Sequence, residues 1–137
     1  MLKYLLISLA VIAAAHVLGI ANSWYWDYWW YDIPLHLAGG AWLGAVFYYV
    51  FVQKKAAIDY GSDLATTLIL ALGFVALIGL IWEFYEYFYD VFISGRHGLL
   101  HVQAGLSDTF KDLINDIIGG AVYTVSCWYL AGKGDEY

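Results

Sequence analysis

The stretch LATTLILALGFVALIGLIWEFYEYFY (residues 64–89) is apolar over most of its length and carries two acidic residues, Glu83 and Glu86, near its end. A helix of this length is long enough to cross the roughly 30 Å hydrocarbon core of a bilayer. Three further segments have a similar character, at residues 4–21, 33–52 and 109–130. We therefore expect an all-α integral membrane protein, a four-helix bundle that forms one transmembrane domain over residues 1–137.

The composition of the whole chain also predicts a lipid environment. Of its 137 residues, 63% are hydrophobic and only 13% are charged, whereas an ordinary soluble domain is about 25% charged. A soluble protein of this size could not cover so much apolar surface with so few charges. The net charge of −6 argues against nucleic acid as a partner, because nucleic acid requires a basic face. The single Cys127 excludes an internal disulfide and a multi-cysteine zinc site.

The basic residues predict the orientation of the helices. Lys3 precedes the first segment, Lys54 and Lys55 follow the second, and Lys133 follows the fourth. With four crossings these lysines lie on one side of the membrane, which the positive-inside rule makes the cytoplasm. We expect a multi-pass protein of the inner (plasma) membrane with both termini in the cytoplasm. Residues 1–22 also have the pattern of a secretory signal, a less favoured alternative.

The segment NSWYWDYWWYD (22–32) carries seven aromatic residues and no basic one. Trp and Tyr concentrate at the membrane–water boundary, where the ring is in an apolar layer and the polar atom reaches water. We expect this segment to lie flat on the outer interface. An aromatic cage around a ligand is the less favoured alternative.

Ionisable side chains gather at three helix ends that hairpin connectivity brings to one level of the membrane. At about 100° per residue, the acids in each helix fall on one face. An uncompensated carboxylate in the membrane costs about 3 kcal/mol on insertion scales. The group therefore requires a bound cation, protonation or a water-filled cavity. Its members are Asp32 and His36 in the second helix, Glu83, Glu86 and Asp90 in the third, and Asp108, Asp112 and Asp116 in the fourth.

A divalent metal ion is the simplest compensation for this charge. Only Arg96 and Lys111 are nearby counter-charges, and we expect Lys111 to point away from the aspartate face. Oxygen ligands with one imidazole suit Mg²⁺, Mn²⁺, Zn²⁺ or Fe²⁺. A hydrated polar pocket without a metal is the alternative. The candidate metal ligands are His36, Glu83, Glu86, Asp108, Asp112 and Asp116.

Two further patterns carry weaker predictions. His97 and His101 in HGLLH have the spacing that grips a metal on a helix, although a solvated loop is the preferred interpretation. Gly39, Gly79 and Gly119 fall on the polar faces of their helices, and small residues allow close approach of membrane helices. We expect these glycines at helix contacts close to the site.

The polar motifs together resemble a known pattern. DIPLH (32–36), WEFYEY (82–87) and DTFKDLINDIIGG (108–120) resemble, in order and spacing, the VanZ-like membrane proteins, and more closely the uncharacterised YjdF-type bacterial inner-membrane proteins. VanZ-like sequences usually carry glutamine at the position of Glu86 and asparagine at that of Asp116, and often have an arginine that Arg96 would match. The resemblance implies a small multi-helix protein of the cell envelope. For VanZ-like proteins it implies a link to teicoplanin resistance, which we do not transfer to this chain.

Three functions remain open on the sequence. The first is a metal-dependent enzyme acting on a lipid-linked phosphate or headgroup, with His36, Glu83 and Asp112 as catalytic residues. In that case Asp32, Glu86, Arg96 and Asp116 would bind the substrate or the cation. The second is binding or transport of a cation, a proton or a small ligand, although acids gathered at one level do not form a full conduction path. The third is a structural or assembly subunit, and no sequence feature selects an oligomeric state.

Overall fold

The computed structural model describes residues 1–55, 58, 63–97, 99 and 101–132. Within this part of the chain every regular element is helical and there is no strand, which confirms the all-α prediction. Lys133 lies outside the described residues. The elements are α1 (Leu2–Ala21), α2 (Trp24–Asp27), α3 (Asp32–Phe47), the π-helical η1 (Tyr48–Lys54), α4 (Leu64–Tyr89), the π-helical η2 (Asp90–Ser94), α5 (Gly95–His97) and α6 (Leu106–Gly132).

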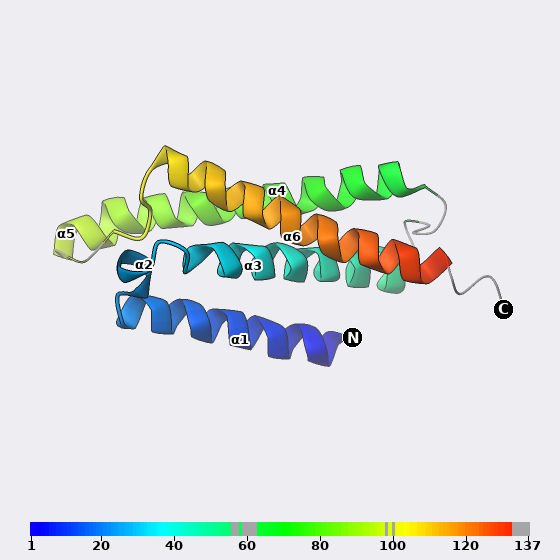
Figure 1. Ribbon diagram of the computed structural model, residues 1–137, viewed down its shortest axis with the longest axis horizontal. Helices are drawn as coiled ribbons and strands as arrows, with labels where there is room; N and C mark the ends of the chain where they lie inside the picture. Colours follow the sequence, from blue (N-terminus) through cyan, green and yellow to red (C-terminus); the bar gives the residue numbers. More distant parts are fainter. Residues whose placement is uncertain (56–57, 59–62, 98, 100, 133–137) are drawn as a thin grey trace.

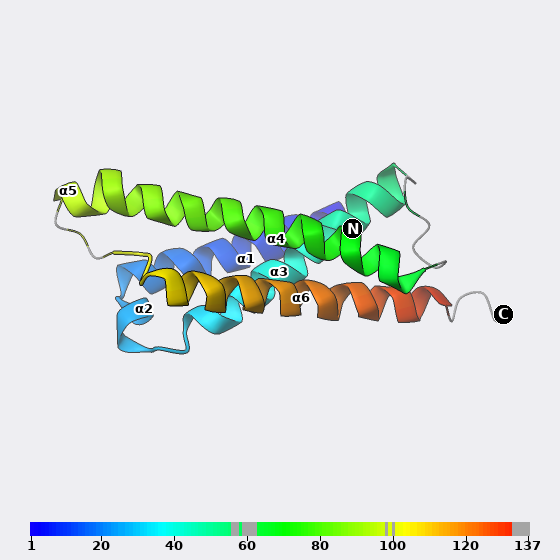
Figure 2. The ribbon, with the colours of Figure 1, turned by 90° about the horizontal axis from the view of Figure 1, so that it is seen from above.

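The long helices of the described residues, α1, α3, α4 and α6, lie along a common axis, with α3 between α1 and α6 (Figure 1). The most extensive contact joins α3 to α6, and α4 packs on α6 and on α3. A view turned by 90° shows α4 and α6 running side by side (Figure 2). The beginning of α1 and the end of α6 point to one end of the molecule, and α2 and α5 lie at the other (Figure 1). The beginnings of α3 and α6 and the end of α4 therefore meet at the end that holds α2.

Three helical stretches among the described residues are long and apolar enough to cross a membrane: Leu2–Ala21, Asp32–Lys54 and Leu64–His97. Helix α6 is not in this set, and it is the most amphipathic of the long helices. It begins at Leu106, three residues before the predicted segment. Its polar face is turned inward, while Ile114, Ile118 and Val122 are exposed.

The distribution of polar and apolar side chains is inverted relative to a soluble protein. The buried side chains of the described residues include nine that are polar or charged and only five that are hydrophobic. Large apolar side chains instead cover the outside of α1, α4 and α6, whereas α3, among the described residues, exposes no large apolar side chain. In water this arrangement would expose the greater part of the apolar surface, whereas in lipid it removes the polar groups from the hydrocarbon.

Glycines bring α3 and α6 into backbone contact. A Cβ atom on Gly40 would overlap the carbonyl oxygen of Asp116, and one on Gly119 would overlap that of Leu37. On α4, a Cβ on Gly79 would lie 2.7 Å from Oδ2 of Asp116. Gly79 and Gly119 therefore lie at close helix contacts, as predicted, whereas the tight position on α3 is Gly40 and its neighbour Gly39 makes only an ordinary contact. This packing places Asp116 between α3 and α4.

Aromatic side chains attach α1 to the rest of the molecule. The indole nitrogen of Trp42 donates a hydrogen bond to the carbonyl of Leu5 at 2.9 Å, and the hydroxyl of Tyr31 donates to the carbonyl of Ala15 at 2.8 Å. The segment predicted to lie flat on the interface contains the single helical turn α2, and its exposed aromatic rings include Trp29, which is 80% exposed. The hydrogen bonds of Trp42 and Tyr31 hold α1 beside α3.

Candidate functional site

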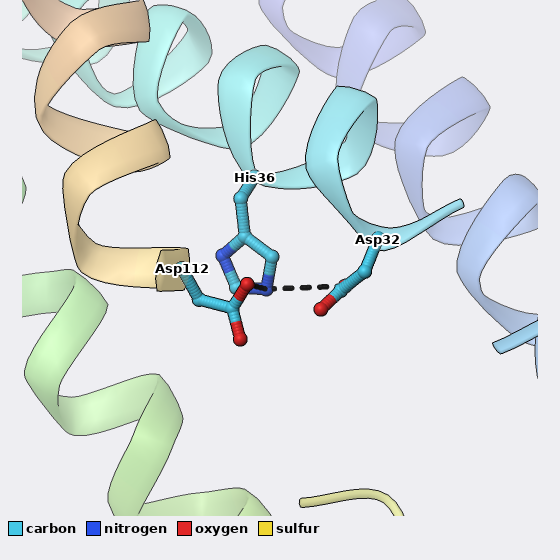
Figure 3. Close-up of side chains that lie close together, drawn as sticks. All are labelled: Asp32, His36 and Asp112. Atoms are coloured by element: carbon cyan, nitrogen blue, oxygen red, sulfur yellow. Dashed lines mark ion pairs between the residues drawn. The ribbon is translucent and has the colours of Figure 1, made fainter. Parts of the chain in front are cut away.

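The imidazole of His36 lies at the centre of the polar group. Asp32 precedes it by one turn of α3, so both side chains project from the same face. Nε2 of His36 is 3.3 Å from Oδ1 of Asp32 and 3.9 Å from Oδ1 of Asp112, and Nδ1 is 3.3 Å from Oδ1 of Asp116. Figure 3 shows the ring between the carboxylates of Asp32, from α3, and Asp112, from α6. Contacts from two helices therefore hold the ring.

Asp32, His36 and Asp112 form the one group of at least three potential ligands among the described residues whose ligand atoms all lie within 4.8 Å of one another. Asp112 is only 1% exposed. Its Oδ1 is buried and accepts no hydrogen bond within the described part of the chain. A buried carboxylate oxygen without a donor is costly. The three side chains therefore present two carboxylates and one imidazole to a position where a cation would be stabilised.

Lys111 reaches this group, so the expectation that it points away was wrong. Its Nζ is 2.5 Å from Oδ1 of Asp108, 3.4 Å from Oδ2 of Asp32 and 3.5 Å from Oδ1 of Asp112. The helical period gives the direction of the Cβ atom, but the long flexible lysine stem bends back over the aspartate face. Lys111 supplies a positive charge at the edge of the group, and Asp108 is paired with it and with the backbone of Ala104.

The two glutamates of α4 have different surroundings. Glu86 is 6% exposed, and its Oε1 accepts a hydrogen bond from the indole nitrogen of Trp82 at 2.8 Å. Glu83 is 3% exposed, and neither of its carboxylate oxygens has a hydrogen-bond partner in the described residues. It lies one turn from Gly79, which contacts Asp116, so it is on the side of α4 that faces α6.

Two predicted site residues between α4 and α6, Asp90 and Arg96, are not part of the polar group around His36. Arg96 is exposed, and its guanidinium lies over the ring of Phe92 at 5.7 Å. Asp90 is buried and accepts hydrogen bonds from the backbone nitrogens of Val102 and Gln103, both at 2.9 Å, so it anchors the chain that leads into α6. Asp90, which the helical period predicted to lie on the acidic face, thus has a structural role.

The HGLLH pattern lies partly outside the described residues, at positions 98 and 100. His97 is exposed at the end of α5. His101 is also exposed, and its Nδ1 is 3.5 Å from Oδ2 of Asp90. In the described part of the chain neither histidine belongs to a group of three potential metal ligands.

A cavity of about 340 Å³ lies beside the polar group, between α1, α3 and α4. Asp32, His36, Glu86 and Asp116 form its polar end. The remaining lining is apolar or aromatic and is drawn from α1, α2, α3 and α4: Leu9, Ile12, Ala13, His16, Val17, Tyr25, Leu35, Gly39, Trp42, Leu43, Ile78, Gly79 and Trp82. The site is therefore amphipathic, with carboxylates at one end and hydrocarbon along the rest.

The sequence analysis did not single out His16 or Tyr25, which both line this cavity. The hydroxyl of Tyr25 is 2.7 Å from Nδ1 of His16, and the His16 ring meets that of Trp82 at 5.3 Å. Burial raises the pKa of Tyr25, and the nearby Asp32 and Glu86 carboxylates raise it further, so the phenol stays protonated. The available signal was a single ionisable residue in an apolar membrane segment, which indicates a functional position by default.

The known protein families provide an independent comparison. The family model described as "Predicted membrane protein (DUF2238)" matches residues 1–133. The chain belongs to this family. No curated protein and no solved structure matches it. Membership supports the membrane location that the three apolar helical stretches indicate, and it does not link the chain specifically to VanZ-like proteins.

Proposed function

We propose that this protein binds a divalent cation at Asp32, His36 and Asp112 and acts with it on a lipid-linked phosphate or headgroup. The observation that carries the proposal is the buried Oδ1 of Asp112, which accepts no hydrogen bond in the described residues and lies 3.5 Å from Nζ of Lys111 and 3.9 Å from Nε2 of His36. Two carboxylates and one imidazole suit Mg²⁺, Mn²⁺, Zn²⁺ or Fe²⁺. A cation there would compensate the charge that the membrane environment penalises.

The surroundings of His36 support its role as the nitrogen ligand. Asp116 lies against Nδ1, which leaves Nε2 directed toward Asp32 and Asp112. A carboxylate on the far nitrogen of a ligating histidine fixes the ring and makes it a better ligand. Asp116 is 5% exposed and is held by the close packing of Gly40 and Gly79, so this orientation is well defined.

The proposed chemistry divides among the neighbouring residues. The cation would polarise a phosphoryl oxygen of the substrate as a Lewis acid. Glu86 borders the cavity and is placed to accept a proton there. Glu83, three residues before it on α4, is a second buried carboxylate. Arg96, exposed over Phe92, has no part in the proposed site.

We further propose that α6 is a fourth membrane-crossing helix in a four-helix bundle with both termini in the cytoplasm of the inner (plasma) membrane. Its apolar side chains face outward and its carboxylates face inward, as the bilayer requires. Lys3 is in the first turn of α1, and Lys54 and Lys55 are at the end of η1. The beginning of α1 lies at the end of the molecule opposite α2 (Figure 1). The aromatic side chains of α2 suit the outer interface. The cation group then lies near the outer leaflet, where lipid headgroups are.

Transport of a cation or proton is the second candidate. It is favoured by Glu83, because a buried carboxylate without a hydrogen-bond partner in the described residues is a typical proton carrier inside a membrane. The gathering of the acids at one end of the helices argues against a continuous pathway. A steady ion flux into proteoliposomes, without phosphate release, would favour this candidate.

The test is metal binding followed by turnover. Elemental analysis of protein purified without chelators should find a bound divalent metal. Added Mn²⁺ or Zn²⁺ should raise the Tm. At a free metal concentration of a hundred times Kd, binding should stabilise the folded protein by about 2.7 kcal/mol. Asp112→Asn should abolish both effects, whereas Asp27→Asn, an exposed control in α2, should keep them. The loaded protein should release phosphate from a polyprenyl phosphate. Absence of metal from the wild type, with no shift in Tm, would contradict the proposal.

A further inference from the structure

We propose that the cavity between α1, α3 and α4 binds an amphiphile from the bilayer that carries an ammonium head on a hydrocarbon tail. The head would lie against the carboxylates of Glu86, Asp32 and Asp116, and the tail along α1. This inference rests on the proposed function for the membrane level of the site and adds to it a second class of ligand, a lipid with a cationic headgroup.

The charge at the polar end of the cavity selects a cation. Three carboxylates border it, those of Asp32, Glu86 and Asp116, and no described lysine or arginine lines it, although Nζ of Lys111 is 3.4 Å from Oδ2 of Asp32. Two histidines also border it, His16 and His36, and the ring of His36 is enclosed between aspartates. An anionic head without a metal would face these carboxylates directly and be repelled, whereas an ammonium would be attracted to them.

The aromatic lining favours an organic ammonium ion in particular. Tyr25, Trp42 and Trp82 border the cavity together with the carboxylates. Ammonium groups bind over aromatic faces, and Trp provides the strongest such interaction. Trp82 is also fixed by its hydrogen bond to Glu86, so an aromatic face and a carboxylate are presented side by side. A small hydrated metal ion would gain nothing from this lining.

The position of the cavity gives access from the lipid. Helix α1 packs mainly on α3 and α2, and the cavity lies between α1 and α4 above the α3 face. Four residues of its wall are exposed on the outside of the molecule: Ala13, Leu9 (40%), Val17 (61%) and Trp82 (39%). In a membrane this mouth opens toward hydrocarbon chains, so a lipid tail can enter sideways without leaving an apolar environment.

The size of the cavity limits what it holds. Its volume of about 340 Å³ is near the lower end of the roughly 300–1,000 Å³ that small-molecule sites occupy. It therefore accepts one headgroup and part of one chain. The rest of the tail would remain in the bilayer through the mouth between α1 and α4.

The experiment uses the full-length protein in the uncharged detergent dodecyl maltoside. Decyltrimethylammonium is compared with decyl sulfate, which has the same tail and the opposite charge, and with tetramethylammonium, which has the head alone. Binding is measured by calorimetry and by the shift in Tm. We expect saturable binding of decyltrimethylammonium, none of decyl sulfate, and binding of tetramethylammonium weaker by about tenfold or more, because it buries no chain. Equal responses to both decyl compounds would overturn the proposal.

Two matched pairs of variants locate the binding. Glu86→Gln keeps an acceptor for Trp82 and removes one charge, so it should weaken decyltrimethylammonium binding by about tenfold, and Asp27→Asn should not. Ala13→Trp fills the cavity from an exposed position of α1 and should block binding, whereas Ala14→Trp, on an exposed residue outside the lining, should not. Unchanged binding of decyltrimethylammonium in both Glu86→Gln and Ala13→Trp would also overturn the proposal.

One further variant separates the two proposals. Asp112 belongs to the cation group and does not line the cavity. Asp112→Asn should therefore lose the response to Mn²⁺ and keep decyltrimethylammonium binding. Ammonium binding in a protein that never binds metal would refute the proposed function alone, and metal binding without ammonium binding would refute this inference alone.

Discussion

Oδ1 of Asp116 lies 3.3 Å from Nδ1 of His36, although 80 positions of sequence separate the two residues. The contact depends on the absence of a side chain at Gly40, because a Cβ there would overlap the carbonyl oxygen of Asp116. With Nδ1 against α6, the other nitrogen of the ring faces Asp32 and Asp112. Helix packing therefore decides which edge of the imidazole is available to a ligand.

The first prediction concerns this orientation. Asp116→Asn removes the charge against Nδ1 but keeps an acceptor of similar shape, so the protein should still fold. We expect the affinity for Mn²⁺ or Zn²⁺ to fall by about tenfold to a hundredfold, the usual effect of losing the partner of a ligating histidine. The measurement is a metal titration followed by Tm, with Asp27→Asn as control. An affinity equal to that of the wild type would mean that Asp116 does not position His36.

The second prediction concerns the glycine contacts. Gly40→Leu and Gly119→Leu place side chains against backbone atoms of the facing helix and should destabilise the protein by about 3 kcal/mol or more. Gly73→Leu is the matched control on α4, where a Cβ would meet no atom of the described residues within 4 Å. It should be neutral or stabilise by up to about 1 kcal/mol, because glycine disfavours a helix. Stability is measured by denaturation in detergent, and equal effects at all three positions would contradict the packing.

The third prediction concerns Lys111, whose ammonium group competes with any bound cation for Asp32 and Asp112. Lys111→Met should bind divalent metal several-fold more tightly and should be less stable than the wild type when metal is removed by a chelator. The control is Lys54→Met, whose lysine lies over the ring of Tyr49 in η1, in a different part of the chain. A loss of metal affinity in Lys111→Met would show instead that the lysine holds the aspartates in place.

The fourth prediction concerns the beginning of α4. Hydrogen bonds from the Thr66 side chain and from the backbone nitrogens of Thr66 and Ala65 lower the pKa of Asp63. Because the folded-state pKa lies below the ordinary value of 3.8, the cap stabilises the fold above that pH and is lost as the pH falls through the folded-state pKa. Asp63→Ala should lower Tm at pH 7, and its difference from the wild type should shrink below about pH 4. A difference independent of pH would mean that the charge of Asp63 is not involved.

The sequence determined the parts of this protein that depend on local periodicity and composition. The lengths and apolarity of the segments predicted the helices, because lipid requires backbone hydrogen bonds to be satisfied within each segment. The spacing of four residues placed Asp32 with His36, and Asp112 with Asp116, on one face of each helix. The positions of these acids within each segment also predicted the helix end at which they lie.

Only the tertiary structure decided how those faces meet. A helical period gives the direction of each Cβ atom within its own helix, but the rotation and register between helices depend on close contacts such as those at Gly40 and Gly119. That is why Asp90 turned out to anchor the chain before α6. The reach of a long side chain is equally non-local, so Lys111 joined the polar group although its position on the helix predicted otherwise. The cavity bordered by His16 exists because α1 is held apart from α4, and no pattern within α1 records that distance.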